Sequence, residues 1–262
     1  MKLFLGSVLY RNVEVAYAES MTLLQRELDR RGIEFTYGAV SGDALVSRSR
    51  SIVASAFMRS DADVLLTIDS DIWFRAQDAI ALCEKAMDRH MIGAMYMTRS
   101  LQTQPALMLP DEEVTFAAGT DPVPVPFIST GFMAVKKDVF RSISLDLPLC
   151  HQGWNDRGQD TSFWPFYMPF TIPWEGDGHM YLSEDWAFCQ RARDLGYKVW
   201  LDPSIRLGHM GQVMFTMEDL IRAPKPDAQP LKLVRSADGQ LQTFTQPARE
   251  ERVIGERVNG HV

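Results

Sequence analysis

Residues 64–74 read Val64-Leu65-Leu66-Thr67-Ile68-Asp69-Ser70-Asp71-Ile72-Trp73-Phe74. Five apolar or β-branched residues lead into two aspartates one residue apart, and a second apolar run follows. The first run is typical of a strand buried on both faces, as in a parallel sheet. Open α/β sheets bind ligands at the carboxyl ends of their strands, so Asp69 and Asp71 are candidate binding residues. Two carboxylates there suit Mg²⁺ or Mn²⁺ shared with substrate phosphates, although Asp and Ser are also common in turns.

The composition is that of a globular protein with one large domain. The 262 residues are 46% hydrophobic and carry a formal net charge of −7, which gives no basic surface of the kind that duplex DNA selects. Three cysteines, far apart, argue against a disulfide framework and a cysteine-based zinc site, and favour a reducing compartment. The first residues lack the features of a signal peptide, and no stretch has the length of a membrane span, so we expect a cytoplasmic protein.

Apolar periodicity predicts alternating strands and helices in the first hundred residues. Strands are expected at 2–10, 33–40, 63–68 and 91–97, and helices at 13–31, 44–59 and 77–89. Asn12 is expected to cap the first helix and Gly32 to end it. This order predicts the α/β class, with a mostly parallel sheet flanked by helices on both faces.

After Thr98 the pattern becomes irregular. We expect a small hairpin at 107–116 that turns near Pro110-Asp111, a strand at 127–135 interrupted by Gly131, a helix at 183–195 capped by Ser183, and a hairpin at 231–244 about Asp238-Gly239. The predicted division is a domain over 1–212 and a partly irregular C-terminal extension over 213–262.

Four features follow one another along the chain. They are Asp69-Ser70-Asp71, the glycine break Ser129-Thr130-Gly131-Phe132, the acidic helix start Ser183-Glu184-Asp185-Trp186, and His209 in Leu207-Gly208-His209-Met210-Gly211. This order resembles the GT-A class of nucleotide-sugar-dependent glycosyltransferases over about residues 2–212. The stretch 45–74 is similar to GT-A enzymes of phage and bacterial genomes, although Ser51 stands where that pattern has Asn.

The resemblance implies a Rossmann-like GT-A fold in a bacterial or phage-infected cell, and a hexosyltransferase. Such an enzyme moves a sugar from a nucleotide sugar, such as a UDP-sugar, to an acceptor hydroxyl. Mn²⁺ or Mg²⁺ would neutralise the leaving diphosphate. Asp71 would ligate the metal directly, Asp69 would bind it through water or hold the ribose, and His209 would complete the metal site.

The acidic pair would act on the acceptor. In inverting members of the resembled class an Asp at this position takes the proton of the acceptor hydroxyl, so Asp185 is the expected base and Glu184 would place the acceptor. Acidic residues at a helix start are also favoured by the helix dipole alone. Inversion is the preferred prediction, and the sequence does not exclude retention.

Other residues are expected to contact substrates. Donor contacts are predicted for Ser7, Tyr10, Arg48, Arg50, Asp69, Ser70 and Gly131, of which the arginines would reach phosphate or the nucleobase and Gly131 would admit the donor sugar. Planar faces for the acceptor are offered by Trp154, Trp164 and Trp174. Burial in the core is the other outcome for such tryptophans.

Three alternatives stay open. The first concerns the acceptor, which is expected to be a glycan, a hydroxylated small molecule or a 5-hydroxymethylpyrimidine in phage DNA. A nucleotidyltransferase that makes nucleotide sugars is a second class, although Gly6-Ser7-Val8-Leu9 lacks its Gly-rich, basic signature. The third is a non-catalytic nucleotide-binding module. The oligomeric state is open.

Overall fold

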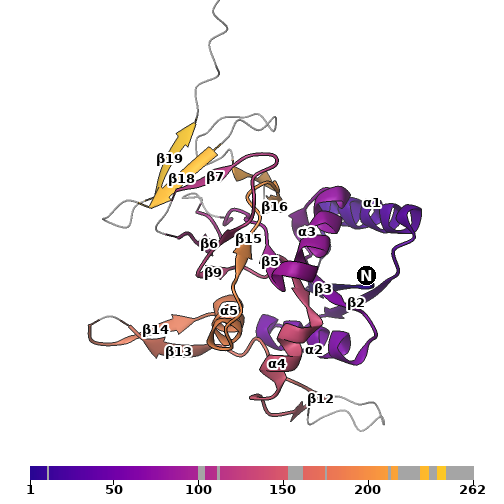
Figure 1. Cartoon of the computed structure of the whole chain (residues 1–262). Helices are drawn as coiled ribbons and strands as arrows, with labels where there is room; N and C mark the ends of the chain where they lie inside the picture. Colours follow the sequence, from indigo (N-terminus) through magenta and orange to yellow (C-terminus); the bar gives the residue numbers. More distant parts are fainter. Residues whose placement is uncertain are drawn as a thin grey trace, which may run out of the picture.

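The computed structural model describes residues 1–10, 12–99, 104–110, 113–152, 162–174, 176–211, 214–217, 231–235 and 241–245. A seven-stranded sheet of order β2-β1-β3-β10-β5-β15-β8 forms its centre (Figure 1). Its strands are β1 (Leu3–Leu9), β2 (Phe35–Ser41), β3 (Val64–Asp69), β5 (Met91–Gly93), β8 (Val123–Pro124), β10 (Phe132–Lys136) and β15 (Trp200–Leu201). All run in one direction except β10 and β8, so the mostly parallel sheet predicted from the sequence is confirmed.

Helices cover both faces of this sheet. Figure 1 shows α1 (Val15–Arg31) and α3 (Ala76–Arg89) on one side, and α2 (Val46–Arg59) and α4 (Lys137–Ser144) on the other, where α5 (Glu184–Asp194) also packs. Successive residues of β3 alternate between the two cores: Leu65 packs with α2, α4 and α5, whereas Leu66 and Ile68 pack with α1 and α3. The apolar run before Asp69 therefore belongs to a strand buried on both faces.

The first helix begins later than predicted and ends where predicted. The helix starts at Val15 with Glu14 in the N-cap position, so the predicted cap at Asn12 is wrong. The backbone N–H of Glu14 donates to the carbonyl of Ser70 at 3.1 Å, which ties the helix start to the loop after β3. Gly32, with a φ of 66°, ends the helix as expected.

One prediction for the middle of the chain is wrong, and a second is refined. The hairpin expected at 107–116 does not form, because β6 (Leu107–Met108) pairs with β9 (Phe127–Ile128) and β7 (Val114–Phe116) pairs with β18 (Leu231–Arg235). The interruption expected at Gly131 in the strand at 127–135 is present, and it separates two strands that belong to different sheets. The first is β9, and the second enters the central sheet as β10, between β3 and β5.

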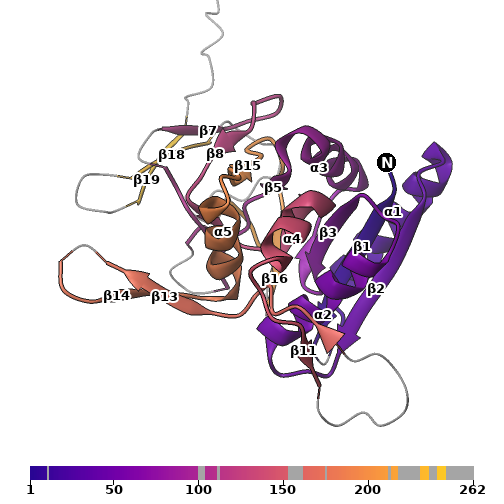
Figure 2. The same cartoon turned by 60° about the horizontal axis from the view of Figure 1, so that its bottom comes forward.

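Small antiparallel pairs complete the fold. They are β11 (Cys150–His151) with β12 (Ser162–Phe163), β13 (Phe170–Pro173) with β14 (His179–Leu182), and β16 (Gly208–Met210) with both β4 (Ile72–Trp73) and β17 (Met214–Phe215). The β13–β14 hairpin projects beside α5 in both Figure 1 and Figure 2.

The C-terminal part contributes one further pair. β18 pairs with β19 (Leu241–Thr245), so the predicted hairpin is confirmed, while its predicted turn at Asp238-Gly239 lies outside the described residues. The proposed division at residue 212 stays a prediction. Within the described ranges, no helix has both the length and the apolar character that crossing a membrane requires.

Candidate active site

The loop between β3 and β4 brings three predicted site residues into one pocket. β3 ends at Asp69 and β4 begins at Ile72, so only Ser70 and Asp71 lie between them. All three polar residues line a pocket of about 250 Å³ at the carboxyl edge of the sheet. The other lining residues are Val8, Tyr10, Asp43, Ala44, Val46, Arg50 and Arg99.

Arg50 joins two acidic residues of the site. Its side chain is 5% exposed, and its two terminal guanidinium nitrogens donate to Asp69 at 2.8 and 2.9 Å. Its Nε lies 3.7 Å from Asp185 Oδ1. Burial would lower the pKa of Arg50, but the carboxylates of Asp69 and Asp185 outweigh that effect and raise it. Arg50 is therefore a buried cation between two carboxylates, and its bidentate contact uses the donors that the sequence assigned to the substrate.

The residues before β10 complete this cluster. Because β10 runs against β3, its start lies beside Asp69, and the backbone N–H of Asp69 donates to the carbonyl of Gly131 at 2.9 Å. The buried Thr130 hydroxyl donates to Asp185. A Cβ atom at position 131 would lie 2.5 Å from the Tyr96 hydroxyl and 2.7 Å from Asp69 Oδ2. The glycine thus makes room for protein groups of the site.

A short strand pair aligns His209 with Asp71. In the β16–β4 ladder His209 lies opposite Ile72, and the backbone N–H of Met210 donates to the carbonyl of Asp71 at 2.7 Å. This register brings His209 Nε2 to 3.5 Å from Asp71 Oδ2. The predicted metal residues Asp71 and His209 are therefore neighbours, although 138 positions separate them in the sequence.

The hydrogen bonds of His209 determine which nitrogen faces Asp71. Nδ1 lies 2.6 Å from the carbonyl oxygen of Met97, and a carbonyl only accepts, so Nδ1 carries a proton. In the neutral imidazole, Nε2 is then an acceptor that faces a carboxylate oxygen. A proton on Nε2 or a metal ion would link these two acceptors directly, beside the Arg99 guanidinium that lies 2.8 Å from the same carboxylate oxygen.

A divalent cation fits this pair. Asp71 Oδ1 is buried and finds no hydrogen-bond partner within the described part of the chain, which leaves one oxygen ligand unused. A carboxylate and an imidazole whose other nitrogen is fixed by a carbonyl are suitable ligands for Mn²⁺, and the carboxylate for Mg²⁺. No group of three His, Cys, Asp or Glu side chains converges anywhere in the described ranges, so water or substrate oxygens would supply the other ligands.

Arg99 is a second cation beside Asp71. Its guanidinium lies 2.8 Å from Asp71 Oδ2, and its side chain is 49% exposed. Burial would raise the pKa of Asp71, but the contact with His209 and the charge of Arg99 outweigh burial and lower it. A guanidinium at the mouth of the pocket is well placed to pair with a second anion.

The acidic pair opens α5 beside this cluster. Ser183 occupies the N-cap position as predicted, but its side chain makes no capping hydrogen bond. Asp185 is held by Thr130 and faces Arg50, whereas burial raises the pKa of Glu184 and the neighbouring charge of Asp185 raises it further. Two adjacent carboxyl groups thus have different surroundings, which is the arrangement that gives them different roles.

The remaining donor candidates are divided between pocket and framework. Tyr10 lines the pocket and is 54% exposed. Ser7 is buried, and its hydroxyl lies 2.6 Å from that of Tyr17, so its side chain belongs to the core. Arg48 is bound at 2.7 and 2.6 Å to Asp43, which lines the pocket, and does not line it itself. Their predicted contacts with the donor stay predictions.

The three candidate tryptophans do not form one surface. Trp154 lies outside the described residues. Trp164 is half-buried beneath the guanidinium of Arg59, 5.5 Å from its ring centre, and packs on the core. Trp174 is 54% exposed and lies at a second pocket, apart from Asp69 and Asp71.

Sequence reasoning missed three groups of the site: Tyr96, Arg99 and Thr130. Thr130 directly precedes the glycine that marked the break, and this adjacency is a usable signal. Tyr96 lies near the end of the predicted strand at 91–97 and Arg99 just after it, and the carboxyl end of the observed β5 lies at the same edge of the sheet. No local pattern distinguishes Arg99 from a surface arginine.

The sequence matches no protein-family model and no curated protein. Among solved structures, the fold is similar to those of several glycosyltransferases. GalNAc-T7 with UDP, GalNAc and Mn²⁺ aligns at a TM-score of 0.49 and 11% identity, over 81% of this chain and 44% of that one. TarS of S. aureus with UDP-GlcNAc aligns at 0.41 and 11%, over 78% and 57%.

The catalytic domain of Drosophila beta1,4galactosyltransferase 7 with xylobiose aligns at a TM-score of 0.39 and 12% identity, over 87% of this chain and 76% of that one. The chain spans less than two thirds of the GalNAc-T7 and TarS structures. At these scores and identities the likenesses assign no activity or substrate to this chain, and a functional assignment has to come from the chemistry of its own site.

Proposed function

We propose that this chain is a metal-dependent glycosyltransferase that moves a sugar from a nucleoside-diphosphate sugar to an acceptor hydroxyl, with inversion. The observation that carries the proposal is the pair Asp71 and His209. Asp71 Oδ2 lies 3.5 Å from His209 Nε2, and the buried Asp71 Oδ1 has no hydrogen-bond partner among the described residues. Asp71 lines the pocket, and His209 is held beside it by the pairing of β16 with β4. This combination suits a divalent ion that shares its remaining coordination positions with a diphosphate.

The residues around the β3–β4 loop would bind the nucleotide-sugar donor. Asp71 and His209 would hold Mn²⁺ or Mg²⁺, and the bound ion supplies positive charge to the leaving nucleoside diphosphate. Asp69, fixed by Arg50, keeps its orientation for a ribose hydroxyl or a metal-bound water. Tyr10 and Ser70 line the same pocket and would contact the nucleoside. A UDP-sugar is the first donor to test.

The acceptor side is assigned to the start of α5. Thr130 donates to Asp185 Oδ1, and Arg50 faces the same oxygen, so the second oxygen is left to accept the proton of the attacking hydroxyl. Glu184, whose pKa is raised, is suited to hold a second acceptor hydroxyl. Asp185 is the proposed catalytic base and Thr130 a positioning residue.

Donor hydrolysis tests the metal assignment. Purified protein is incubated with UDP-glucose, UDP-GlcNAc or GDP-mannose and Mn²⁺, and released nucleoside diphosphate is measured. We expect slow release with at least one donor, abolished by EDTA. Asp71→Ala and His209→Ala should weaken Mn²⁺-dependent UDP binding, whereas His179→Ala, an exposed histidine on β14, should bind as the wild type does. Unchanged UDP and Mn²⁺ binding by Asp71→Ala would exclude the proposed metal site.

A second experiment tests the base. Asp185→Asn should keep donor binding and lose transfer to the acceptor. The acceptor panel contains oligosaccharides, small polyols and DNA with hydroxymethylated pyrimidines, and the anomeric configuration of the product reports inversion or retention. Normal turnover by Asp185→Asn would exclude Asp185 as the base.

A further inference from the structure

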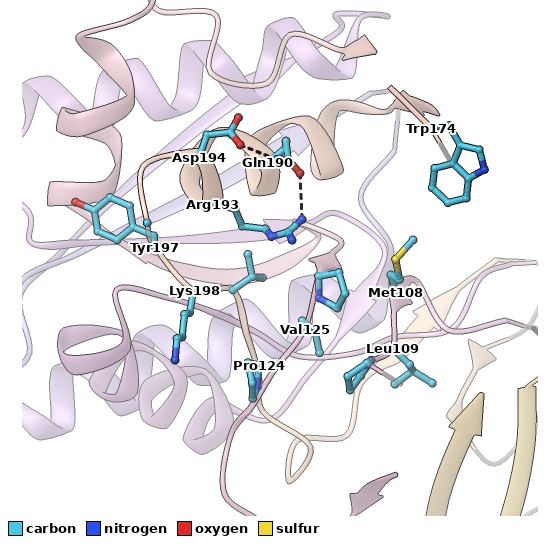
Figure 3. Close-up of a pocket in the computed structure, with 14 residues that line it drawn as sticks. Met108, Leu109, Pro124, Val125, Trp174, Gln190, Arg193, Asp194, Tyr197 and Lys198 are labelled. Atoms are coloured by element: carbon cyan, nitrogen blue, oxygen red, sulfur yellow. Dashed lines mark hydrogen bonds between the residues drawn. The ribbon is translucent and has the colours of Figure 1, made fainter. Parts of the chain in front are cut away.

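A second pocket, of about 860 Å³, lies along the C-terminal half of α5 and shares no residue with the pocket at Asp69 and Asp71. Figure 3 shows polar side chains of the helix on one side of the hollow, and Pro124, Val125 and Leu109 on the other. Trp174, from the end of the β13–β14 hairpin, lies toward one end, with Met108 nearby. The volume is in the range of small-molecule binding sites.

The polar side of this pocket is ordered by hydrogen bonds. Gln190 Nε2 donates to Asp194 Oδ1 at 2.7 Å, and a guanidinium nitrogen of Arg193 donates to Gln190 Oε1 at 3.0 Å. The Arg193 guanidinium also lies over the ring of Phe127, 5.1 Å from its centre. An amide, a carboxylate and a guanidinium are thus held side by side, and together they offer both donors and acceptors.

The apolar side adds a planar face. Trp174 is 54% exposed although it lines the pocket, so much of its indole is open to a ligand. Sugars have an apolar C–H face and a ring of hydroxyls, each of which both donates and accepts. An open indole at one end of a row of amide, carboxylate and guanidinium groups offers partners for both features.

The helix connects this pocket with the proposed active site. Trp186, Gln190 and Arg193 follow one another at helical spacing on one face of α5, beginning one residue after Asp185. Trp186 stacks on Phe127 with ring centres 4.9 Å apart, and Arg193 covers the same ring. The distance along the helix from Trp186 to Asp194 is about 12 Å at 1.5 Å per residue, which is longer than one sugar ring.

We propose that this pocket, the α5 pocket, binds the distal sugars of an oligosaccharide acceptor whose reactive hydroxyl lies at Asp185. The acceptor role rests on the proposed function, whereas saccharide binding by the α5 pocket does not. The acceptor class is accordingly an oligosaccharide, and a free monosaccharide would reach only one end of the site.

Binding is tested without donor or metal. The probes are cellotetraose, chitotetraose, xylotetraose, maltotetraose and mannotetraose, and saturation-transfer NMR gives their dissociation constants. At least one should bind the wild type, and Trp174→Ala should bind it about tenfold more weakly. Tyr181→Ala is the matched control, because Tyr181 is a 65% exposed aromatic residue on the same hairpin that does not line the α5 pocket. Gln190→Ala should weaken binding as Trp174→Ala does.

Two results would overturn saccharide binding: none of the five tetrasaccharides binds the wild type, or Tyr181→Ala weakens binding as much as Trp174→Ala. Both aromatic residues are exposed, and thermal melts check that each variant is folded.

The acceptor role is tested with the donor that the wild type hydrolyses fastest. The tetrasaccharide that binds should have a lower KM as acceptor than its monosaccharide, and Trp174→Ala should raise that KM about tenfold with kcat retained. Equal KM values for the two acceptors would overturn the acceptor role. Failure of the proposed function has a different signature, namely no donor hydrolysis by the wild type, whatever the tetrasaccharides do.

Discussion

Replacing Arg50 with methionine should destabilise the protein far more than the same replacement of Arg48. Both arginines lie on α2, two residues apart, and each donates two hydrogen bonds to one aspartate. Arg50 binds Asp69 at 2.8 and 2.9 Å with a side chain that is 5% exposed. Arg48 binds Asp43 at 2.7 and 2.6 Å with a side chain that is 44% exposed. Both contacts are bidentate, through the two terminal nitrogens in Arg50 and through Nε and one terminal nitrogen in Arg48, and the two arginine side chains differ in burial.

The magnitudes follow from that difference. Removal of one partner of a buried ion pair costs about 3–5 kcal/mol, because the other charge is left uncompensated. Asp69 retains 23% exposure, so we expect the lower end, about 3 kcal/mol, for Arg50→Met. Arg48 is half-exposed although Asp43 is 10% exposed, so we expect about 1 kcal/mol for Arg48→Met, the upper end of the range for surface pairs. At about 2–4 °C per kcal/mol, Arg50→Met should lower Tm by roughly 6–12 °C.

Urea denaturation at pH 7, followed by circular dichroism, measures both variants. The double variant Arg50→Met/Asp69→Asn should recover part of the loss, since it removes the uncompensated carboxylate as well. In 1 M NaCl the small effect of Arg48→Met should vanish, whereas the effect of Arg50→Met should persist, because buried charges are poorly screened. Equal free energies of unfolding for Arg50→Met and Arg48→Met would refute the reasoning.

Three further predictions concern the same site. Gly131→Ala should lower the free energy of unfolding by about 1–3 kcal/mol and also weaken Mn²⁺-dependent UDP binding. Gly6→Ala is the control, because its Cβ would be as crowded, 2.6 Å from Val53, and it should lower stability alone; an equal loss of UDP binding in the two variants would contradict this. Glu184→Gln should raise Tm at pH 7 but not at pH 3. The pKa of Glu184 is raised in the folded protein, so its carboxyl group destabilises the fold as the pH rises from its unfolded pKa through its folded pKa; a higher Tm at both pH values would exclude this cause. Thr130→Val should lower kcat for transfer by roughly tenfold or more with the donor KM unchanged, since a hydrogen bond to the proposed base is lost; an unchanged kcat would remove Thr130 from the site.

The parts of the fold that could be predicted are those fixed by neighbours in the sequence. The apolar run before Asp69 forms β3, Gly32 ends α1, and the order of strands and helices implies the mostly parallel sheet. Each depends on periodicity or on a conformation that glycine adopts readily. The same local signals located the chain segments that carry the acidic residues of the site.

The parts that could not be predicted depend on pairing between distant segments. Turn residues near Pro110 suggested a local hairpin, but β7 finds its partner in β18, more than a hundred residues later. The sequence predicts that Arg50 contacts the substrate, and only the packing of α2 on the sheet shows that its guanidinium donates two hydrogen bonds to Asp69. The alignment of His209 with Asp71 likewise depends on a ladder that no local pattern encodes.

The antiparallel direction of β10 determines where the long connection that precedes it leaves and rejoins the sheet. β5 ends, and β10 begins, at the same edge of the sheet, and the connection between them contributes β8, which pairs with β15 at the far side of the sheet. Insertions or deletions in the parts of this connection that precede or follow β8 would leave the strand order intact and would alter the surroundings of the pocket. Specificity can therefore diverge by changes of loop length there, while the carboxylates at the end of β3 keep their positions.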